Sequence, residues 1–266
     1  MRSYHSRVDP GTDKVASALY DAIGFGYAQR RRPDERIARQ LRSGLRGAAP
    51  ILNVGAGAGS YEPTDRQVVA VEPSAAMIAQ RHPGAAPVVR AVAGSLPFPD
   101  RSFEGCMALL TVHHWPDPLA GIAELRRVTR GPIVVLTFDQ EVHAQQWIVS
   151  EYLPDMAVLD PALPGPERIA RALGGGSIEV VNVPWDCTDG FCHAWWRRPA
   201  AYLDETVRSA ISGIARLPAG VVADAMARLG ADIASGTWDK EHRHLLEKQE
   251  IDAGYRIVVS PGDVAA

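Results

Sequence analysis

The segment 55–59 carries glycine at every second position and follows directly on the short apolar run 51–54. A second apolar run, 68–71, ends at Glu72. Glycine lets a turn approach a ligand closely, and a carboxylate can accept hydrogen bonds from both hydroxyls of a ribose. The spacing is typical of a strand, a tight turn, a helix and a second strand. It predicts a nucleotide-type ligand site outside the carboxyl ends of parallel strands.

Two adjacent histidines, His113 and His114, follow the apolar run 104–110. An unperturbed imidazole has a pKa of about 6.5, so a histidine at a strand end could take a proton from a bound ligand. The alternative is that one of the two caps or packs the following helix. Because consecutive side chains at a strand end point to opposite faces, we expect at most one of them to face a ligand.

Aromatic side chains gather after a later apolar run, 178–183. The four that we single out are Trp185, Phe191, Trp195 and Trp196. Aromatic faces suit an apolar ligand and attract a cation, so these residues are candidates for a ligand pocket or lid. The same residues could instead form a core seam that joins a helical segment to the sheet.

Another candidate group lies near the N-terminus, where a helical pattern is interrupted at 24–26 by Gly-Phe-Gly. Tyr20, Tyr27 and the basic run 30–32 surround this bend. Their hydroxyls and a guanidinium could close over an anionic ligand. The other interpretation is that the tyrosines lie at the edge of the core and the arginines on a solvated face.

Apolar runs alternate with amphipathic segments along most of the chain, which is typical of βαβ units. We therefore predict an α/β fold, a doubly wound, Rossmann-like and mostly parallel sheet of seven strands with helical lid insertions. The expected strands are 51–54, 68–71, 87–92, 104–110, 132–138, 178–183 and 255–259. The expected organisation is an N-terminal helical flap (1–46), the cofactor-binding half of the domain (47–139), a first insertion (140–177), the remaining core strands (178–184 and 254–260) and a helical lid (185–253).

Composition narrows the class of function. The chain has 266 residues, of which 46% are hydrophobic and 22% charged, and its formal net charge is −3. This balance gives no reason to expect a nucleic-acid partner. Three cysteines without a CxxC pair, the lack of a signal-peptide pattern, and apolar runs far shorter than the ~18 residues of a membrane span predict a cytoplasmic protein without a membrane segment.

Four motifs together resemble a known family: the glycine segment 55–59, Val-Glu-Pro-Ser at 71–74, Leu-Pro-Phe-Pro-Asp-Arg-Ser-Phe at 96–103, and Val-His-His-Trp at 112–115. The chain resembles the class I S-adenosylmethionine-dependent methyltransferases, particularly the small-molecule branch related to ubiquinone and menaquinone biosynthesis C-methyltransferases. The resemblance covers about residues 15–139. It implies S-adenosylmethionine as cofactor, S-adenosylhomocysteine as product and a small molecule as substrate.

The resemblance also implies which residues hold the cofactor. They are Tyr20, Tyr27, Arg31 (or Arg32), Asn53, Gly55, Gly57, Glu72, Pro73, Met77, Ala93, Gly94 and Thr111. The chain departs from the family at Asn53, where an acidic residue is usual, and at Val92 and Gly94, where the adenine edge often meets an acidic residue. Adenine recognition would therefore use backbone groups of Ala93 and Gly94.

For the reaction, we expect in-line methyl transfer to an aromatic or otherwise apolar acceptor, with His114 or His113 as the catalytic base if the acceptor must lose a proton. We expect no metal, and we expect His242 and His244 on a solvated helix face. Two alternatives stay open: a nicotinamide-dependent oxidoreductase, against which the missing third glycine of GxGxxG speaks, and a catalytically inactive cofactor-binding partner subunit. The sequence does not tell carbon, nitrogen and oxygen acceptors apart.

Overall fold

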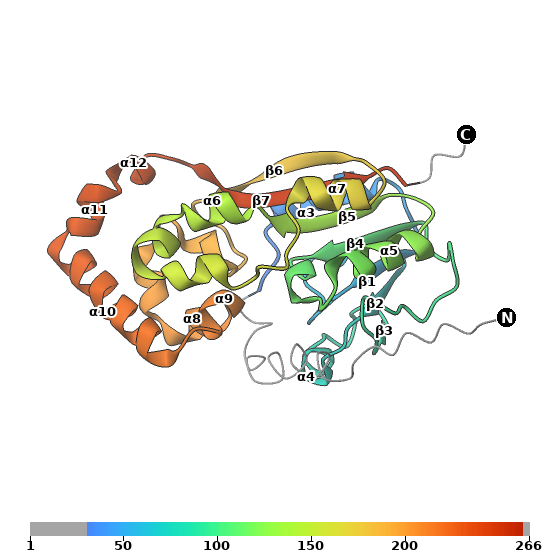
Figure 1. Ribbon diagram of the computed structural model, residues 1–266, viewed down its shortest axis with the longest axis horizontal. Helices are drawn as coiled ribbons and strands as arrows, with labels where there is room; N and C mark the ends of the chain where they lie inside the picture. Colours follow the sequence, from blue (N-terminus) through green and yellow to red (C-terminus); the bar gives the residue numbers. More distant parts are fainter. Residues whose placement is uncertain (1–30, 263–266) are drawn as a thin grey trace.

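The computed structural model describes residues 31–262, which are built around one seven-stranded sheet of order β3-β2-β1-β4-β5-β7-β6 (Figure 1). The strands are β1 (Ile51–Val54), β2 (Val68–Val71), β3 (Val88–Val89), β4 (Gly105–Leu109), β5 (Ile133–Phe138), β6 (Ser177–Pro184) and β7 (Glu250–Ser260). β1 to β5 are parallel, whereas β7 runs antiparallel to both of its neighbours. The predicted doubly wound, mostly parallel sheet of seven strands is confirmed.

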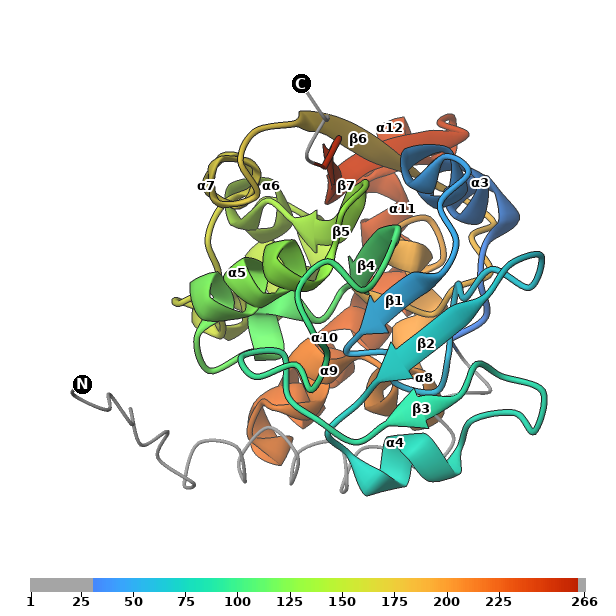
Figure 2. The same ribbon diagram turned by 90° about the vertical axis from the view of Figure 1, so that its right-hand side faces the viewer.

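Helices cover both faces of this sheet, which explains why its central strands are apolar on both sides. Ile51 of β1 packs in one core cluster with α3 (Glu35–Leu45), and the next residue, Leu52, packs in the other with α5 (Pro118–Val128). α7 (Pro166–Ala172) joins α5 on that second face, as Figure 2 shows. The strict alternation of side chains along a strand thus divides the core into two layers.

Strand lengths differ from the predictions at the ends of the sheet. β3 keeps only two of the six expected residues, because it lies at an edge, is half-buried and pairs only with β2. β7 is longer than expected, since it pairs with β5 through its second half and with β6 along most of its length. Within residues 31–262, no helix combines the length and the apolar character that crossing a bilayer requires.

The carboxyl edge of the sheet gathers the segments that carry chemistry. The glycine segment follows β1, Glu72 follows β2, and 3-10 helix η1 (Val112–His114) comes shortly after β4. α4 (Ala75–Ala79) lies beside this edge.

A mostly helical region continues from the end of β5, and we call residues 140–160 and 191–246 the helical lobe (Figure 1, left). Its first part holds α6 (Gln140–Ala144), η2 (Ile148–Tyr152) and η3 (Pro154–Val158). Its second part holds η4 (Cys192–Trp195), η5 (Pro199–Leu203), α8 (Glu205–Ser209), α9 (Ser212–Ala215), α10 (Ala219–Ser235), α11 (Thr237–Glu241) and α12 (Arg243–Leu246).

The interior of the lobe is aromatic. The Trp147 ring lies 5.2 Å from that of Trp238 and 5.5 Å from that of Tyr202. His242 packs against the same tryptophans and is 5% exposed. The expectation of a solvated face at His242 is therefore wrong, because this ring fills the aromatic core of the lobe.

Candidate active site

A cavity of about 710 Å³, which we call the first pocket, opens at the carboxyl ends of β1, β2 and β4. This volume lies within the range of about 300–1,000 Å³ that is common for small-molecule sites. The predicted cofactor residues between 53 and 111 all line it: Asn53, Gly55, Gly57, Glu72, Pro73, Met77, Ala93, Gly94 and Thr111. Sequence positions almost sixty residues apart therefore meet around one cavity, as the parallel sheet requires.

The turn after β1 depends on glycine for a reason internal to the protein. Gly55 has a φ of +70°, and its N–H donates to Val71 O over 2.9 Å. A Cβ at this position would lie 2.0 Å from Oγ1 of Thr111. Glycine at 55 thus allows both the left-handed backbone and the close approach of the segment after β4.

Glu72 is the carboxylate at the tip of β2, and it is 6% exposed. Its Oε2 accepts the N–H of Gly57 over 2.8 Å, and its Oε1 accepts the N–H of Ser74 over 2.9 Å. Burial raises the pKa of this carboxyl, and the two backbone donors oppose that rise. Each oxygen retains a further lone pair, so the side chain can accept two hydroxyl donors of a ligand in the pocket.

A buried ion pair that the sequence analysis missed supports the glycine segment. Nη2 of Arg81 lies 2.7 Å from Oε2 of Glu62, and the two side chains are 4% and 8% exposed. Nη1 of Arg81 donates to Gly57 O over 3.2 Å, and Glu62 Oε1 accepts from Nδ2 of Asn53 over 3.0 Å. The network fixes the end of β1 and the glycine turn in one arrangement.

This network gives a physical reason why position 53 carries an asparagine where the resembled family usually has an acidic residue. The Asn53 amide donates to the Glu62 carboxylate, whereas an aspartate there would face it with like charge. Glu62, nine residues further along the chain, does not line the first pocket, and its charge is paired with Arg81. No motif marks Glu62 or Arg81, so only the folded chain reveals their pairing.

His113 and His114 have ring centroids 3.8 Å apart, yet they line different cavities. His114 lines the first pocket, and His113 lines a smaller cavity of about 70 Å³, which we call the second pocket. Arg31 and Leu110 line both, so the pockets adjoin. The expectation that at most one of the histidines faces an acceptor stays a prediction.

The second pocket is assembled from distant parts of the chain. Besides Arg31, Leu110 and His113, its walls are Phe138, His143, Met156, Leu159, Asp160, Phe191, Cys192, Ala210, Ile211, Ser212, Gly213 and Tyr255. They come from β5, the helical lobe and β7. Of these twelve, only Phe191 was singled out in the sequence, because no local pattern connects the rest.

Both histidines of the second pocket are neutral near pH 7. Burial lowers the pKa of His113 to about 3, and the positive charges of Arg216 and Arg31 lower it further. Burial lowers the pKa of His143 to about 4, while the negative charge of Asp160 acts in the opposite direction. The two imidazole rings of the second pocket are therefore uncharged.

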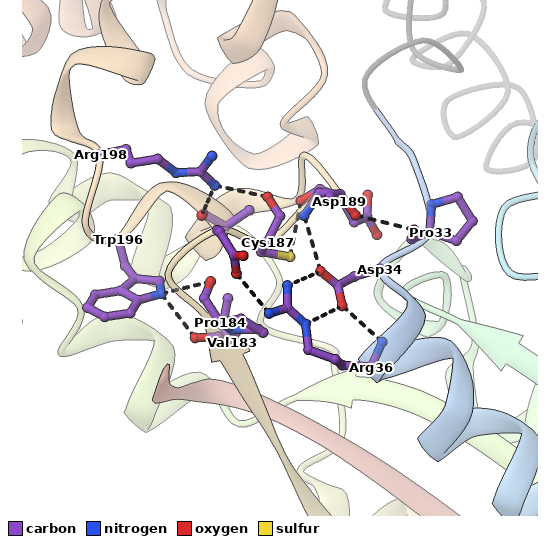
Figure 3. Close-up of polar contacts among 12 residues, drawn as sticks. Pro33, Asp34, Arg36, Val183, Pro184, Cys187, Asp189, Trp196 and Arg198 are labelled. Atoms are coloured by element: carbon purple, nitrogen blue, oxygen red, sulfur yellow. Dashed lines mark hydrogen bonds and ion pairs between the residues drawn. The ribbon is translucent and has the colours of Figure 1, made fainter. Parts of the chain in front are cut away.

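The three tryptophans predicted to hold substrate line neither pocket. Trp185 is 40% exposed, with the Arg197 guanidinium 5.2 Å from its ring. Trp195 lies under Arg198 at 4.4 Å. Trp196 is 1% exposed, and its Nε1 donates to Val183 O over 3.0 Å (Figure 3). Trp196 therefore belongs to the seam between the lobe and β6.

The segment before α3 is tied to the loop after β6. Asp34 accepts the N–H of Thr188 and forms an ion pair with Arg36, as Figure 3 shows. Nε of Arg31 lies 2.6 Å from Oδ1 of Asp189, which has no exposed surface. Arg31 is thus held at the boundary of the two pockets, while Tyr20 and Tyr27 lie outside the described residues.

One group in the described part of the chain has the geometry of a metal site. Ligand atoms of Glu151, Glu241 and His242 lie within 4.8 Å of one another. They belong to η2, α11 and the residue after it, and none of them lines either pocket. The absence of a metal from the reaction stays a prediction.

Comparisons with known proteins agree with this geometry. A family model described as a methyltransferase domain matches residues 52–132. A structure from Anabaena variabilis, described as a methyltransferase from an antibiotic biosynthesis pathway, is 30% identical, covers 87% of this chain and 99% of its own, and has a TM-score of 0.81. The (4+2)-cyclase SpnF shares the fold at 16% identity and a TM-score of 0.56, over 97% of this chain and 98% of its own. Among curated proteins, none matches.

Proposed function

Because the chain belongs to the class I S-adenosylmethionine-dependent methyltransferases, we propose that it methylates a small-molecule acceptor that is aromatic or otherwise apolar. The observation that carries the proposal is the junction of the two pockets, where Arg31 and Leu110 line both. A donor site and an acceptor site must meet in this way for direct transfer, since the reacting atoms come within about 3–3.5 Å of each other.

We assign the cofactor to the first pocket. Glu72 would accept the ribose hydroxyls, and the backbone of 55–59 would pass beside the amino-acid part. Met77 and the backbone of Ala93 and Gly94 would border the adenine. Asn53, Pro73, Thr111 and Arg31, with Tyr20 and Tyr27, complete the proposed set. The cofactor supplies an electrophilic methyl group, and the protein holds it in place.

We assign the acceptor to the second pocket. The rings of Phe138, Phe191 and Tyr255 offer flat apolar walls that suit an aromatic acceptor. His113 lies on this side of the junction and contacts the acceptor, whereas His114 lies on the cofactor side. The predicted lid role of 185–253 is kept only for its second-pocket residues, because Trp185, Trp195 and Trp196 line neither cavity.

The Anabaena relative supports an acceptor from secondary metabolism. It is described as belonging to an antibiotic biosynthesis pathway, and the alignment covers almost its whole length. We extend this setting to the present chain in place of the ubiquinone and menaquinone branch to which the motifs pointed.

Thermal unfolding with candidate cofactors tests the first assignment. S-adenosylhomocysteine at about 100 times its Kd stabilises a one-site protein by about 2.7 kcal/mol, so a clear rise in Tm is expected. NAD at the same concentration serves as the control and is expected to leave Tm unchanged. A shift with NAD alone would refute the assignment.

Turnover tests the second assignment. Purified protein is incubated with S-adenosylmethionine and a panel of small aromatic alcohols, amines and carbon acids, and S-adenosylhomocysteine formation is measured. We expect product from at least one single-ring acceptor, and product analysis then tells carbon, nitrogen and oxygen methylation apart. Cofactor binding without turnover across the panel would favour the inactive partner subunit instead.

A further inference from the structure

Two histidines form a buried pair at the wall of the second pocket, and neither has a role in the transfer proposed above. Nδ1 of His143, on α6, lies 2.7 Å from Nε2 of His193, on η4. The residues are 9% and 1% exposed. Burial of two imidazoles beside apolar walls is costly unless their nitrogens are used, so the pair calls for an explanation.

The backbone holds this pair in place. α6 begins at Gln140 with Asp139 as its cap, and the Asp139 N–H donates to Gly254 O over 2.7 Å. Gly254 has a φ of +92°, and a Cβ there would lie 3.0 Å from the backbone nitrogen of His143. Glycine in β7 therefore lets the first turn of α6 lie close against the sheet, which fixes the His143 ring.

The hydrogen bond to His193 leaves one ring nitrogen of His143 for a ligand. Since Nδ1 is engaged, Nε2 is the atom that can serve the pocket that His143 lines. If Nδ1 carries the proton and donates it to His193, then Nε2 is a bare acceptor. In that arrangement His193 carries its own proton on Nδ1, and its Nε2, as the acceptor, holds His143 in this tautomer.

His143 is better placed than His113 to become positively charged. The other charged or titratable groups around the pocket are Arg31 with Asp189, Asp160 with Arg216, Cys192 and Tyr255. Asp160 favours the charged form of His143, whereas Arg216 and Arg31 disfavour that of His113. The charges around the second pocket therefore favour protonation of His143 over protonation of His113.

The second pocket also limits the size of its ligand. On the measure by which one water needs about 10–15 Å³, its volume of about 70 Å³ admits roughly five to seven water-sized groups. That is the size of one substituted ring. The apolar walls and the bare nitrogen together fit a ring that carries a hydrogen-bond donor.

The geometry points to His143 as the base that accepts the proton of a single-ring hydroxyl acceptor, with His193 as the residue that positions it. This inference rests on the proposed methyl transfer. The acceptor oxygen gains the methyl group, and its proton goes to Nε2 of His143. The electron pair of the broken carbon–sulfur bond stays with the thioether product. The imidazolium that forms replaces the sulfonium charge that disappears, so the net charge of the site is unchanged.

Nitrogen-15 NMR of the histidine side chains tests the tautomer without any turnover. Protein saturated with S-adenosylhomocysteine is examined at pH 7, and we expect His143 to carry its proton on Nδ1. In His193→Gln the amide oxygen can still accept this bond, so the tautomer stays, whereas in His193→Leu it is lost. A proton on Nε2 of wild-type His143, or the same tautomer in both variants, would overturn the inference.

Phenol, a single ring with one hydroxyl, serves as the ligand probe. We expect calorimetry to show binding in the presence of S-adenosylhomocysteine and a loss of about tenfold in His143→Phe, because the buried hydroxyl loses its acceptor. S-adenosylhomocysteine affinity should stay within about threefold of wild type. His242→Phe is the matched control, since His242 is also buried and paired through one ring nitrogen, but lines neither pocket.

The outcomes separate the two proposals. If S-adenosylhomocysteine fails to bind the wild-type protein, the proposed function fails. If S-adenosylhomocysteine binds but phenol does not, or phenol binds equally well to His143→Phe, then only the role of His143 fails.

Discussion

The two pockets share a wall but are built in opposite ways. The first pocket is lined mainly by residues from one stretch between Asn53 and Ala120, and the buried ion pair of Glu62 with Arg81 supports its glycine turn. The second pocket draws on residues from Arg31 to Tyr255, and its imidazoles are kept neutral by burial. One site is thus local and supported by a buried ion pair, and the other is assembled from distant parts of the chain around neutral imidazoles.

The difference matches the ligands that we propose for the two sites. A cofactor of fixed shape can be bound by a short motif at a sheet edge, where backbone groups and one carboxylate meet its polar atoms. An acceptor pocket beside a sulfonium gains nothing from extra positive charge, so neutral histidines suit it.

We expect the largest effect when the buried ion pair that supports the first pocket is removed. Glu62→Gln leaves the buried guanidinium of Arg81 without its counter-charge, which costs about 3–5 kcal/mol of unfolding free energy. Urea unfolding measures the loss. Glu104→Gln is the control, because its pair with Arg130 is 42% and 47% exposed and is worth at most about 1 kcal/mol. Similar losses in both variants would contradict the supporting role of Glu62.

Glu72→Ala should weaken binding of S-adenosylhomocysteine by about 100-fold or more, since two hydrogen bonds to a charged group are worth about 1.5–3 kcal/mol each. Isothermal titration calorimetry measures the change. Affinity for phenol in the second pocket serves as the internal control and should change far less. Wild-type affinity for the cofactor product would remove the ribose assignment of Glu72.

Because the histidines of the second pocket are buried in the neutral form, we expect the protein to lose stability in acid. His143 has a folded pKa of about 4, below the unfolded value of 6.5, so the unfolded state binds more protons between these pH values. Stability is therefore lost as pH falls below about 6.5, by about 2 kcal/mol at pH 5 from this residue alone. Glu72, with a raised pKa, acts in the opposite sense and loses stability as pH rises.

Urea unfolding at pH 7, 6 and 5 measures this dependence. His143→Phe should show a flatter profile than wild type, while His242→Phe is the control for replacing a buried histidine outside the pockets. An unchanged slope in His143→Phe would contradict the neutral state of His143.

We expect the smallest effect from replacing the two histidines that lie between the pockets. His113→Asn should slow turnover of a ring acceptor by about tenfold, within the lower range for loss of one positioned polar contact, with cofactor affinity nearly unchanged. His114→Asn should instead alter cofactor affinity, because His114 lines the first pocket. Initial rates and S-adenosylhomocysteine titrations separate the two. Full activity in both variants would limit this segment to a packing role.

The sequence predicts the first pocket well because its signals are local. The glycine spacing at 55–59 requires a turn, and Glu72 follows a strand that must end at the same sheet edge. The family resemblance adds Thr111 and Ala93, and both line the first pocket. Glu62 and Arg81 were not predicted, because hydrophobic periodicity indicates helices and strands but not which long side chains pair across the fold.

The second pocket could not be predicted in the same way. His143 and His193 are fifty residues apart, and only the fold, which brings α6 and η4 together, places them within hydrogen-bond distance. Aromatic density after β6 pointed to Trp185, Trp195 and Trp196, but composition does not tell a core seam from a ligand wall. Of that group, Phe191 alone lines a pocket.

The order of the strands has a consequence for how the protein is made. β7 is the last strand along the chain, yet it lies inside the sheet between β5 and β6. During synthesis, β5 and β6 expose unpaired edges until residues 250–260 leave the ribosome and insert between them. The His143 side of the pocket, which packs on Gly254, can form only after this last insertion. Nascent chains halted before residue 250 should therefore be targets for chaperones that shield open sheet edges.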